Sequence, residues 1–255
     1  MTQFWLSIIF GALIGLSLGL VGGGGSILTV PILVYAIGQP VHDATTTSLA
    51  IVGLNALAGV VGHARAGNVQ VRTGLAFGAA GIAGAFVGSW LNTLVAGPLL
   101  LALFAAVMLA AAGAMLRRPP PASEVAPVNT GPRNWPNLIA TGTGVGLMTG
   151  FFGVGGGFVI VPALVLVLGL PMRAAVGTSL LIIAINSASG LLAHLRYGGL
   201  DLEITALFVL GGLGGVIGGV RLAGRVPQRR LSQIFAAMII LVAGYVLYRS
   251  YTAFM

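Results

Sequence analysis

The chain has 255 residues, of which 57% are hydrophobic and only 6% are charged, and its mean hydropathy is +1.05. Soluble domains carry about 25% charged residues, so the composition excludes a soluble globular protein and predicts an all-α polytopic membrane protein. Cysteine is absent, which excludes disulfides and thiolate metal sites. All twelve basic residues are arginines that lie singly or in pairs between apolar segments, a pattern typical of membrane topology signals rather than of nucleic-acid binding.

Hydrophobic segments follow one another along the chain, five in each half. Those of the first half cover about 4–21, 26–37, 44–62, 73–95 and 98–116. Those of the second half cover about 138–152, 157–169, 175–193, 204–222 and 231–248. The second segment of each half is shorter than the ~20 residues that a helix needs to cross a bilayer, so we expect a half-helix or a re-entrant piece there. The first two segments of each half are then either two crossings or one hairpin, and each half crosses the membrane an odd number of times, five or three.

The two halves are copies of one unit, since a shift of 131 residues aligns them without a gap. The match includes residue types that chance similarity between apolar helices does not reproduce. They are Pro31/Pro162, Pro40/Pro171, Asn55/Asn186, His63/His194, Arg65/Arg196, Gly81/Gly212 and Gly88/Gly219. We therefore expect a transmembrane repeat over 1–116, a Pro-rich cytoplasmic linker over 117–136 and a second transmembrane repeat over 137–255.

An odd number of crossings turns the second repeat upside down in the membrane. With the loop 63–72 in the cytoplasm, the inverted arrangement places ten of the twelve arginines on the cytoplasmic side. Parallel repeats would divide the arginines seven against five. The excess of positive charge in cytoplasmic loops favours two inverted-topology repeats, with both termini in the periplasm.

Glycine-rich stretches interrupt the hydrophobic pattern at equivalent places in the two repeats. Glycine allows sharp turns and a close approach of backbone to ligand, and a helix that starts after such a break presents free N–H groups suited to an anion. The alternative is that these glycines only let helices pack closely, an interpretation that we favour for the scattered Gly59, Gly81, Gly84 and Gly88. The candidate substrate-binding residues at the breaks are Gly22, Gly23, Gly24, Gly25, Ser26, Gly153, Gly155, Gly156 and Gly157.

Polar residues recur on one face of the third segment of each repeat. They are Ser48 and Asn55 in the first repeat and Ser179 and Asn186 in the second, and Thr47 and Thr178 directly precede the two serines. The threonines and serines open these segments, so they are candidates to cap the helices or to donate to substrate. An asparagine inside a bilayer is costly without a partner. Each of the two asparagines can therefore serve in an interhelical hydrogen bond, in a substrate contact, or in both.

Histidine and arginine close the third segments, at His63 and Arg65 and again at His194 and Arg196. The histidines are candidates for proton transfer or for a gate, and the arginines for attracting an anion; the alternative is a cation at a helix C-terminus together with a topology signal. The four acidic residues, Asp43, Glu124, Asp201 and Glu203, lie in loops or in the linker. A proton or sodium site built on a carboxylate is therefore not expected. We expect instead an anion facilitator that is driven by the membrane potential.

The motif "GLVGGGGSILTVPIL…TTTSLAIVGLNALAG" and its copy "GFFGVGGGFVIVPAL…GTSLLIIAINSASG", each followed by H-x-R-x-G, resemble the TauE/SafE sulfite exporter family of bacterial membrane permeases. The resemblance covers nearly the whole chain apart from the linker. It implies export of sulfite, sulfoacetate or a related organosulfonate across the bacterial inner membrane. An anion channel, or a permease for an unrelated anionic metabolite, is the alternative.

The sequence also gives expectations for cofactors, partners and mechanism. No cofactor or metal is expected, and no nucleophile paired with a base supports an enzyme. The expected partners are a small anionic substrate and the lipid bilayer. The glycine-rich face over 211–219 serves a homodimer or internal packing equally well. The mechanism that inverted repeats with broken helices favour is alternating access around a site near the membrane midplane.

Overall fold

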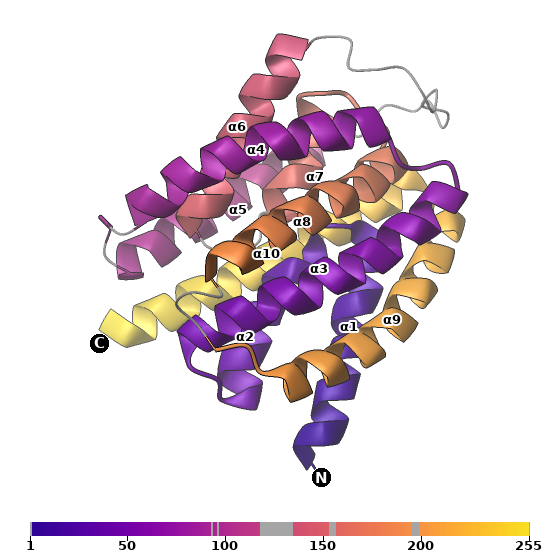
Figure 1. Cartoon of the computed structure of the whole chain (residues 1–255). Helices are drawn as coiled ribbons and strands as arrows, with labels where there is room; N and C mark the ends of the chain where they lie inside the picture. The colour runs from indigo at the N-terminus through magenta and orange to yellow at the C-terminus, as the bar shows by residue number, and fades with distance from the viewer. Residues whose placement is uncertain are drawn as a thin grey trace.

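A computed structural model describes residues 2–92, 94–95, 97–117, 135–152, 157–194 and 199–254. Helices make up most of these residues and no strand occurs among them, as the composition predicts (Figure 1). By length and composition five of the described helices are able to cross a membrane. Most of the linker expected over 117–136 lies outside the described residues.

The expected hydrophobic segments are confirmed as helices. The first repeat forms α1 Thr2–Val21, α2 Gly24–Ile32 continued by a π-helix η1 Leu33–Ile37, α3 Val41–Arg65, α4 Val71–Asn92 and α5 Gly97–Arg117. The second forms α6 Trp135–Phe152, α7 Gly157–Leu166, α8 Met172–His194, α9 Leu202–Arg225 and α10 Gln228–Phe254. Helices α3 and α8 each begin three residues earlier than expected.

The connection from the short helix to the third long helix is built identically in both repeats. Gly38 and Gly169 take φ values of +84° and +67°, which glycine adopts without the strain that a Cβ would add. The next residue bonds back over the helix end: Gln39 N donates to Leu33 O at 3.0 Å, and the equivalent bond of the second repeat is also 3.0 Å. A proline then precedes α3 and α8. The repeated motif thus fixes one local geometry twice.

Helices α1, α3 and α9 form one parallel bundle that mixes the two repeats (Figure 1). Along α1, glycines contact α9 at steadily rising positions. The contacts are Gly11 with Phe208, Gly15 with Gly212 and Gly19 with Val216. A Cβ on any of these glycines would overlap the α9 backbone, so small residues bring the two helices together, as van der Waals packing between membrane helices requires.

Helices α6, α8 and α4 are the counterparts of α1, α3 and α9 in the other repeat, and they form an equivalent bundle. Each α1–α9 contact recurs between α6 and α4 after the shift of 131 residues. The contacts are Gly142 with Phe77, Gly146 with Gly81 and Gly150 with Ala85. Gly84 and Gly88 likewise pack against Thr143 and Leu147 of α6. The interpretation that these scattered glycines serve helix packing is confirmed.

The two bundles meet along α3 and α8, the equivalent third helices. Their contacts are Leu49 with Gly190, Gly53 with Ser187 and Gly59 with Leu180. As the residue number rises on α3 it falls on α8, so the two equivalent helices run antiparallel.

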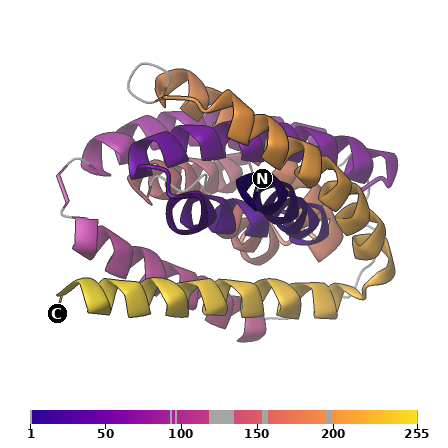
Figure 2. The same ribbon diagram turned by 90° about the horizontal axis from the view of Figure 1, so that it is seen from below.

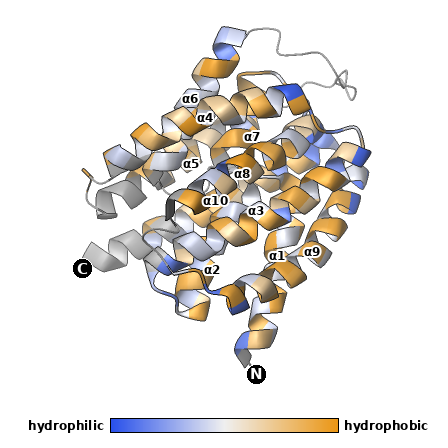
Figure 3. Ribbon diagram, in the orientation of Figure 1, coloured by the Kyte–Doolittle hydropathy of each residue, from blue (hydrophilic) through white to orange (hydrophobic). Residues whose placement is uncertain are grey.

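Helices α5 and α10 pack on each other as a separate pair beside the two bundles (Figure 2). The short helices α2 and α7 touch each other, and they also contact this pair: α2 contacts α10, and α7 contacts α5. Hydrophilic residues gather toward the helix ends while the middles are hydrophobic (Figure 3). Large apolar side chains such as Phe86 and Leu241 stay exposed, as expected for surfaces that face lipid.

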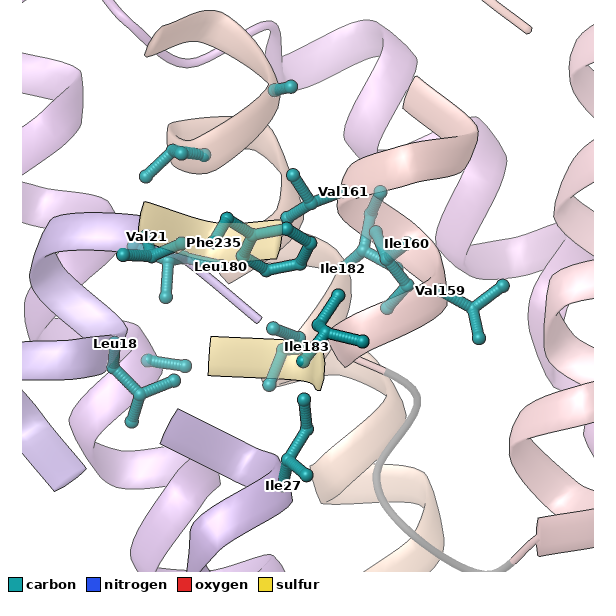
Figure 4. Packing of buried hydrophobic residues seen from close by; sticks show 14 of the residues in the cluster. Leu18, Val21, Ile27, Val159, Ile160, Val161, Leu180, Ile182, Ile183 and Phe235 are labelled. Carbon is teal, nitrogen blue, oxygen red and sulfur yellow. The ribbon is translucent and has the colours of Figure 1, made fainter. Parts of the chain in front are cut away.

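The apolar core surrounds the two short helices (Figure 4). Ile27 of α2, Ile160 of α7, Ile183 of α8 and Phe235 of α10 are all buried in it. The first glycine-rich stretch, residues 22–25, is itself buried next to this core.

Candidate functional site

The first glycine-rich stretch turns the chain back on itself. Helix α1 ends at Val21, and Gly22 takes φ +76°, a conformation that side chains with a Cβ rarely adopt. Helix α2 then returns along α1, so that a Cβ on Gly25 would lie 2.5 Å from both Ile14 O and Leu18 Cγ. The first two hydrophobic segments therefore form a hairpin rather than two full crossings.

The two glycine-rich breaks come together. Gly23 lies against Gly157, the first residue of α7, and a Cβ on Gly23 would overlap the Gly157 carbonyl. A Cβ on Gly157 would lie 2.6 Å from Gly23 Cα and 2.5 Å from Ser26 Oγ. Backbone contact this close requires glycine at both positions. Gly153, Gly155 and Gly156 lie outside the described residues.

Helix α2 begins at Gly24, two residues before the expected start near Ser26, whereas α7 begins at Gly157 as expected. No side chain caps α2, and the Ser26 hydroxyl donates instead to Gly23 O at 2.7 Å. The first N–H groups of a helix have no partner within the helix and lie at the positive end of its dipole. This buried turn can therefore accept an anion.

Two further residues lie on the first break. A Cβ on Gly22 would overlap Ser179 Oγ of α8, and one on Gly24 would overlap the terminal methyl of Met238 of α10. Met238 was missed by sequence reasoning because a methionine inside an apolar helix carries no signal of its own. Only the packing of α10 on α2 places Met238 there.

The prediction that threonine and serine cap the third helices is wrong. Because α3 begins at Val41 and α8 at Met172, Thr47, Ser48, Thr178 and Ser179 all lie in the second turns. Thr178 Oγ1 accepts from the Gln70 N–H at 3.0 Å, and the Ser179 hydroxyl donates to Val176 O at 2.8 Å. Thr47 is fully buried and, among the described residues, its hydroxyl has no hydrogen-bond partner.

The asparagines lie where each bundle is tightest. Asn55 is 0% exposed, and its amide packs on Gly212 at the level where Gly15 crosses α9. In the described part of the chain neither amide atom of Asn55 has a hydrogen-bond partner. Asn186 packs on Gly81 in the equivalent place of the second bundle, and its Oδ1 also has no partner there. The described contacts thus place the asparagines at the bundle crossings rather than on the Gly23–Gly157 contact.

His63 is enclosed rather than presented at a mouth of the protein. It is 1% exposed, and its Nε2 lies 2.8 Å from Gly19 O. Arg65 is exposed at the end of α3. Arg196 and the side chain of His194 lie outside what the structure describes.

Loops of the two repeats are joined at both ends of the bundles. The Gly199 N–H donates to Asp43 Oδ1 at 3.0 Å, which ties the start of α3 to the segment after α8. At the opposite ends of these helices, Gln70 N donates to Thr178 Oγ1, which ties the segment after α3 to the start of α8. The two contacts connect regions that are more than a hundred residues apart in sequence.

The fold is that of a multi-pass helical membrane protein whose two halves share equivalent helix contacts. A family model described as "Sulfite exporter TauE/SafE" matches residues 7–246. The chain therefore belongs to the TauE/SafE sulfite exporter family, and the resemblance of its motifs is confirmed. This membership identifies it as a membrane transporter.

Curated relatives cover almost the same length. A "Probable membrane transporter protein" of Xylella fastidiosa (strain 9a5c) is 37% identical over 95% of this chain and 94% of its own. The "Probable membrane transporter protein YdhB" of Bacillus subtilis (strain 168) is 29% identical over 88% of this chain and 91% of its own. No solved structure matches the chain significantly.

Proposed function

We propose that the protein exports a small sulfur-containing anion, such as sulfite, sulfoacetate or a related organosulfonate, across the bacterial inner membrane. The observation that carries the proposal is the meeting of Gly23 and Gly157, one from each repeat, inside the apolar core. The family, described as sulfite exporters, supports the substrate class. In this proposal the candidate site also includes Gly22, Gly24, Gly25, Ser26, Gly153, Gly155 and Gly156.

Recognition of an oxyanion at the breaks rests on backbone groups. Helix α2 starts with Gly24, Gly25 and Ser26, all buried, so its first N–H groups lie in an environment of low dielectric constant. Electrostatic attraction to an anion is stronger there than in water, and no side chain caps the start of α2. Asn55 and the Thr/Ser residues of α3 and α8 are the side chains that we propose to complete the binding site.

An inverted arrangement of the repeats is supported by two contacts. Equivalent helices related by an axis in the membrane plane run antiparallel, as α3 and α8 do. The hydrogen bond from the Gly199 N–H to Asp43, in the first turn of α3, also supports this arrangement, because inverted repeats bring the start of α3 and the segment after α8 to one side. We propose alternating access in which the α5–α10 pair moves against the two bundles, with both termini in the periplasm.

The membrane potential is the proposed driving force. A singly charged anion that leaves a cell with a negative interior gains about 2.3 kcal/mol per 100 mV. Among the described residues, the acidic side chains Asp43 and Asp201 act as hydrogen-bond acceptors near helix ends. No carboxylate is thus assigned to ion coupling in this proposal.

The test is flux of sulfite in proteoliposomes with an imposed potential. We expect saturable uptake that increases when the interior is positive and that sulfoacetate inhibits more strongly than taurine or acetate. Flux that ignores the potential and the competitors would overturn the proposal. Ohmic, non-saturating currents in a planar bilayer would instead identify an anion channel.

A further inference from the structure

The end of α1 leaves a backbone carbonyl that the helix itself does not satisfy. The last four carbonyls of an α-helix have no N–H partner within the helix. In α1 the Gly22 N–H closes on Leu18 O at 2.8 Å. The chain then leaves the helical path, and the Gly19 carbonyl receives a hydrogen bond from His63 Nε2 of α3 at 2.8 Å. A side chain from another helix thus terminates the first half of the broken helix.

This hydrogen bond defines the form of the imidazole. The Gly19 carbonyl only accepts, so Nε2 carries the proton. The other ring nitrogen, Nδ1, is buried and has no hydrogen-bond partner among the described residues. A proton relay needs a partner on each ring nitrogen, and the described part of the structure supplies one only at Nε2. The geometry thus favours a fixed hydrogen-bond donor over the proton transfer considered from the sequence.

His63 also packs against helix α8. A Cβ on Gly177 of α8 would lie 3.0 Å from His63 Cβ, so α8 packs closely on this histidine. Two residues further along α8, Ser179 lies against Gly22. His63 therefore lies between the end of α1 and the part of α8 that contacts Gly22.

We propose that His63 is a positioning residue for transport: by donating to Gly19 O it terminates α1 and holds Gly22 and Gly23 in register with Ser179 and Gly157. The inference rests on the proposed function of the break as the substrate site. It assigns to His63 a backbone partner that the H-x-R-x-G motif does not reveal.

The test compares three variants of the full-length protein. His63→Gln keeps an N–H donor at about the reach of Nε2, His63→Asn holds its donor one bond too short, and His63→Leu has none. Loss of one buried hydrogen bond corresponds to about a tenfold change. We expect His63→Leu and His63→Asn to transport sulfite about tenfold less well at subsaturating concentration, chiefly through a raised apparent KM, and His63→Gln to stay within about threefold of the parent, with an unchanged pH profile.

A second readout does not require transport. Amide hydrogen exchange of residues 20–26 in detergent should be faster in His63→Leu and His63→Asn than in His63→Gln, because local opening follows the loss of the hydrogen bond. Size-exclusion chromatography controls for folding, and if His63→Leu fails to fold, the Gln–Asn pair still decides. Equal exchange and equal transport in Gln and Asn variants would overturn the inference. Altered exchange in a protein without sulfite flux in any form would instead contradict the proposed function alone.

Discussion

Ser26 and Gly157 occupy equivalent positions in the two repeats, and they face each other: the Ser26 hydroxyl lies 2.5 Å from the point where a Cβ on Gly157 would be. Two serines would not fit in that space. The imperfect duplication of the glycine-rich stretches thus has a steric origin, because a residue and its own counterpart meet where the two breaks converge.

Alanine at Gly23 should prevent transport, whereas alanine at Gly24 should not. The new Cβ at Gly23 would overlap the Gly157 carbonyl, and backbone cannot move aside without separating α2 from α7. The new Cβ at Gly24 meets only the terminal methyl of Met238, the end of a flexible side chain. Overpacking costs about 1–3 kcal/mol, so we expect at least a tenfold loss of sulfite flux for Gly23→Ala and less than about twofold for Gly24→Ala. Similar flux from both variants would contradict a close contact between the breaks.

Replacement of Asn55 by the similarly shaped leucine separates function from stability. A buried polar group without a partner costs about 1–3 kcal/mol, and both amide atoms of Asn55 are in this state among the described residues. We expect Asn55→Leu to retain or raise the melting temperature in detergent while sulfite flux falls more than tenfold. Asn186→Leu is the matched variant in the other bundle. If Asn55→Leu transported normally, the asparagine would have no place in the substrate site.

Two neighbouring glycines of α9 should differ sharply in their tolerance of alanine. A Cβ on Gly215 would overlap the Ala12 carbonyl of α1, whereas a Cβ on Gly214 meets nothing within 4 Å. Gly215→Ala should lower the stability of the folded protein by about 1–3 kcal/mol, and Gly214→Ala should leave it unchanged. Thermal unfolding in detergent measures both. An equal loss at Gly214 would indicate that α9 faces a partner on that side.

Cysteine labelling tests the inverted topology directly, since the natural chain contains no cysteine. Ala66 and Gly199 are exposed in the corresponding loops after α3 and α8. Inverted repeats place Ala66→Cys in the cytoplasm and Gly199→Cys in the periplasm, so a membrane-impermeant maleimide added to whole cells should label only Gly199→Cys. Labelling of both from the same side would establish parallel repeats.

Helix positions were largely predictable, because long apolar segments leave little choice in a membrane. The errors at the starts of α3 and α8 have a local cause. Polar residues such as His42 and Asp43 interrupt the apolar pattern, but Pro40 and Pro171, which lack an N–H, already set the first helical turn. The threonines assigned to caps consequently lie one turn inside the helices.

The candidate site was predictable only in part. The two glycine-rich stretches indicated Gly23 and Gly157, although the duplication is imperfect at both positions, and these two do meet. Duplication of unusual residues indicated Asn55 and His63, whose described contacts are a helix crossing and a backbone carbonyl. A repeated motif shows that a residue matters in both copies, but it does not distinguish a ligand contact from a packing contact.

The sequence by itself determined the membrane class, the duplicated unit, the family and the two places where helices break, because these follow from hydropathy, periodicity and residue identity along the chain. Only the tertiary structure decided that α1 pairs with α9 of the other repeat, that α2 turns back along α1, and that His63 terminates the broken helix. Several helices carry similar glycine faces, so their local sequences do not select a partner. Which helices pair depends on how all the helices pack together at once, because the glycines allow close backbone contact at several places.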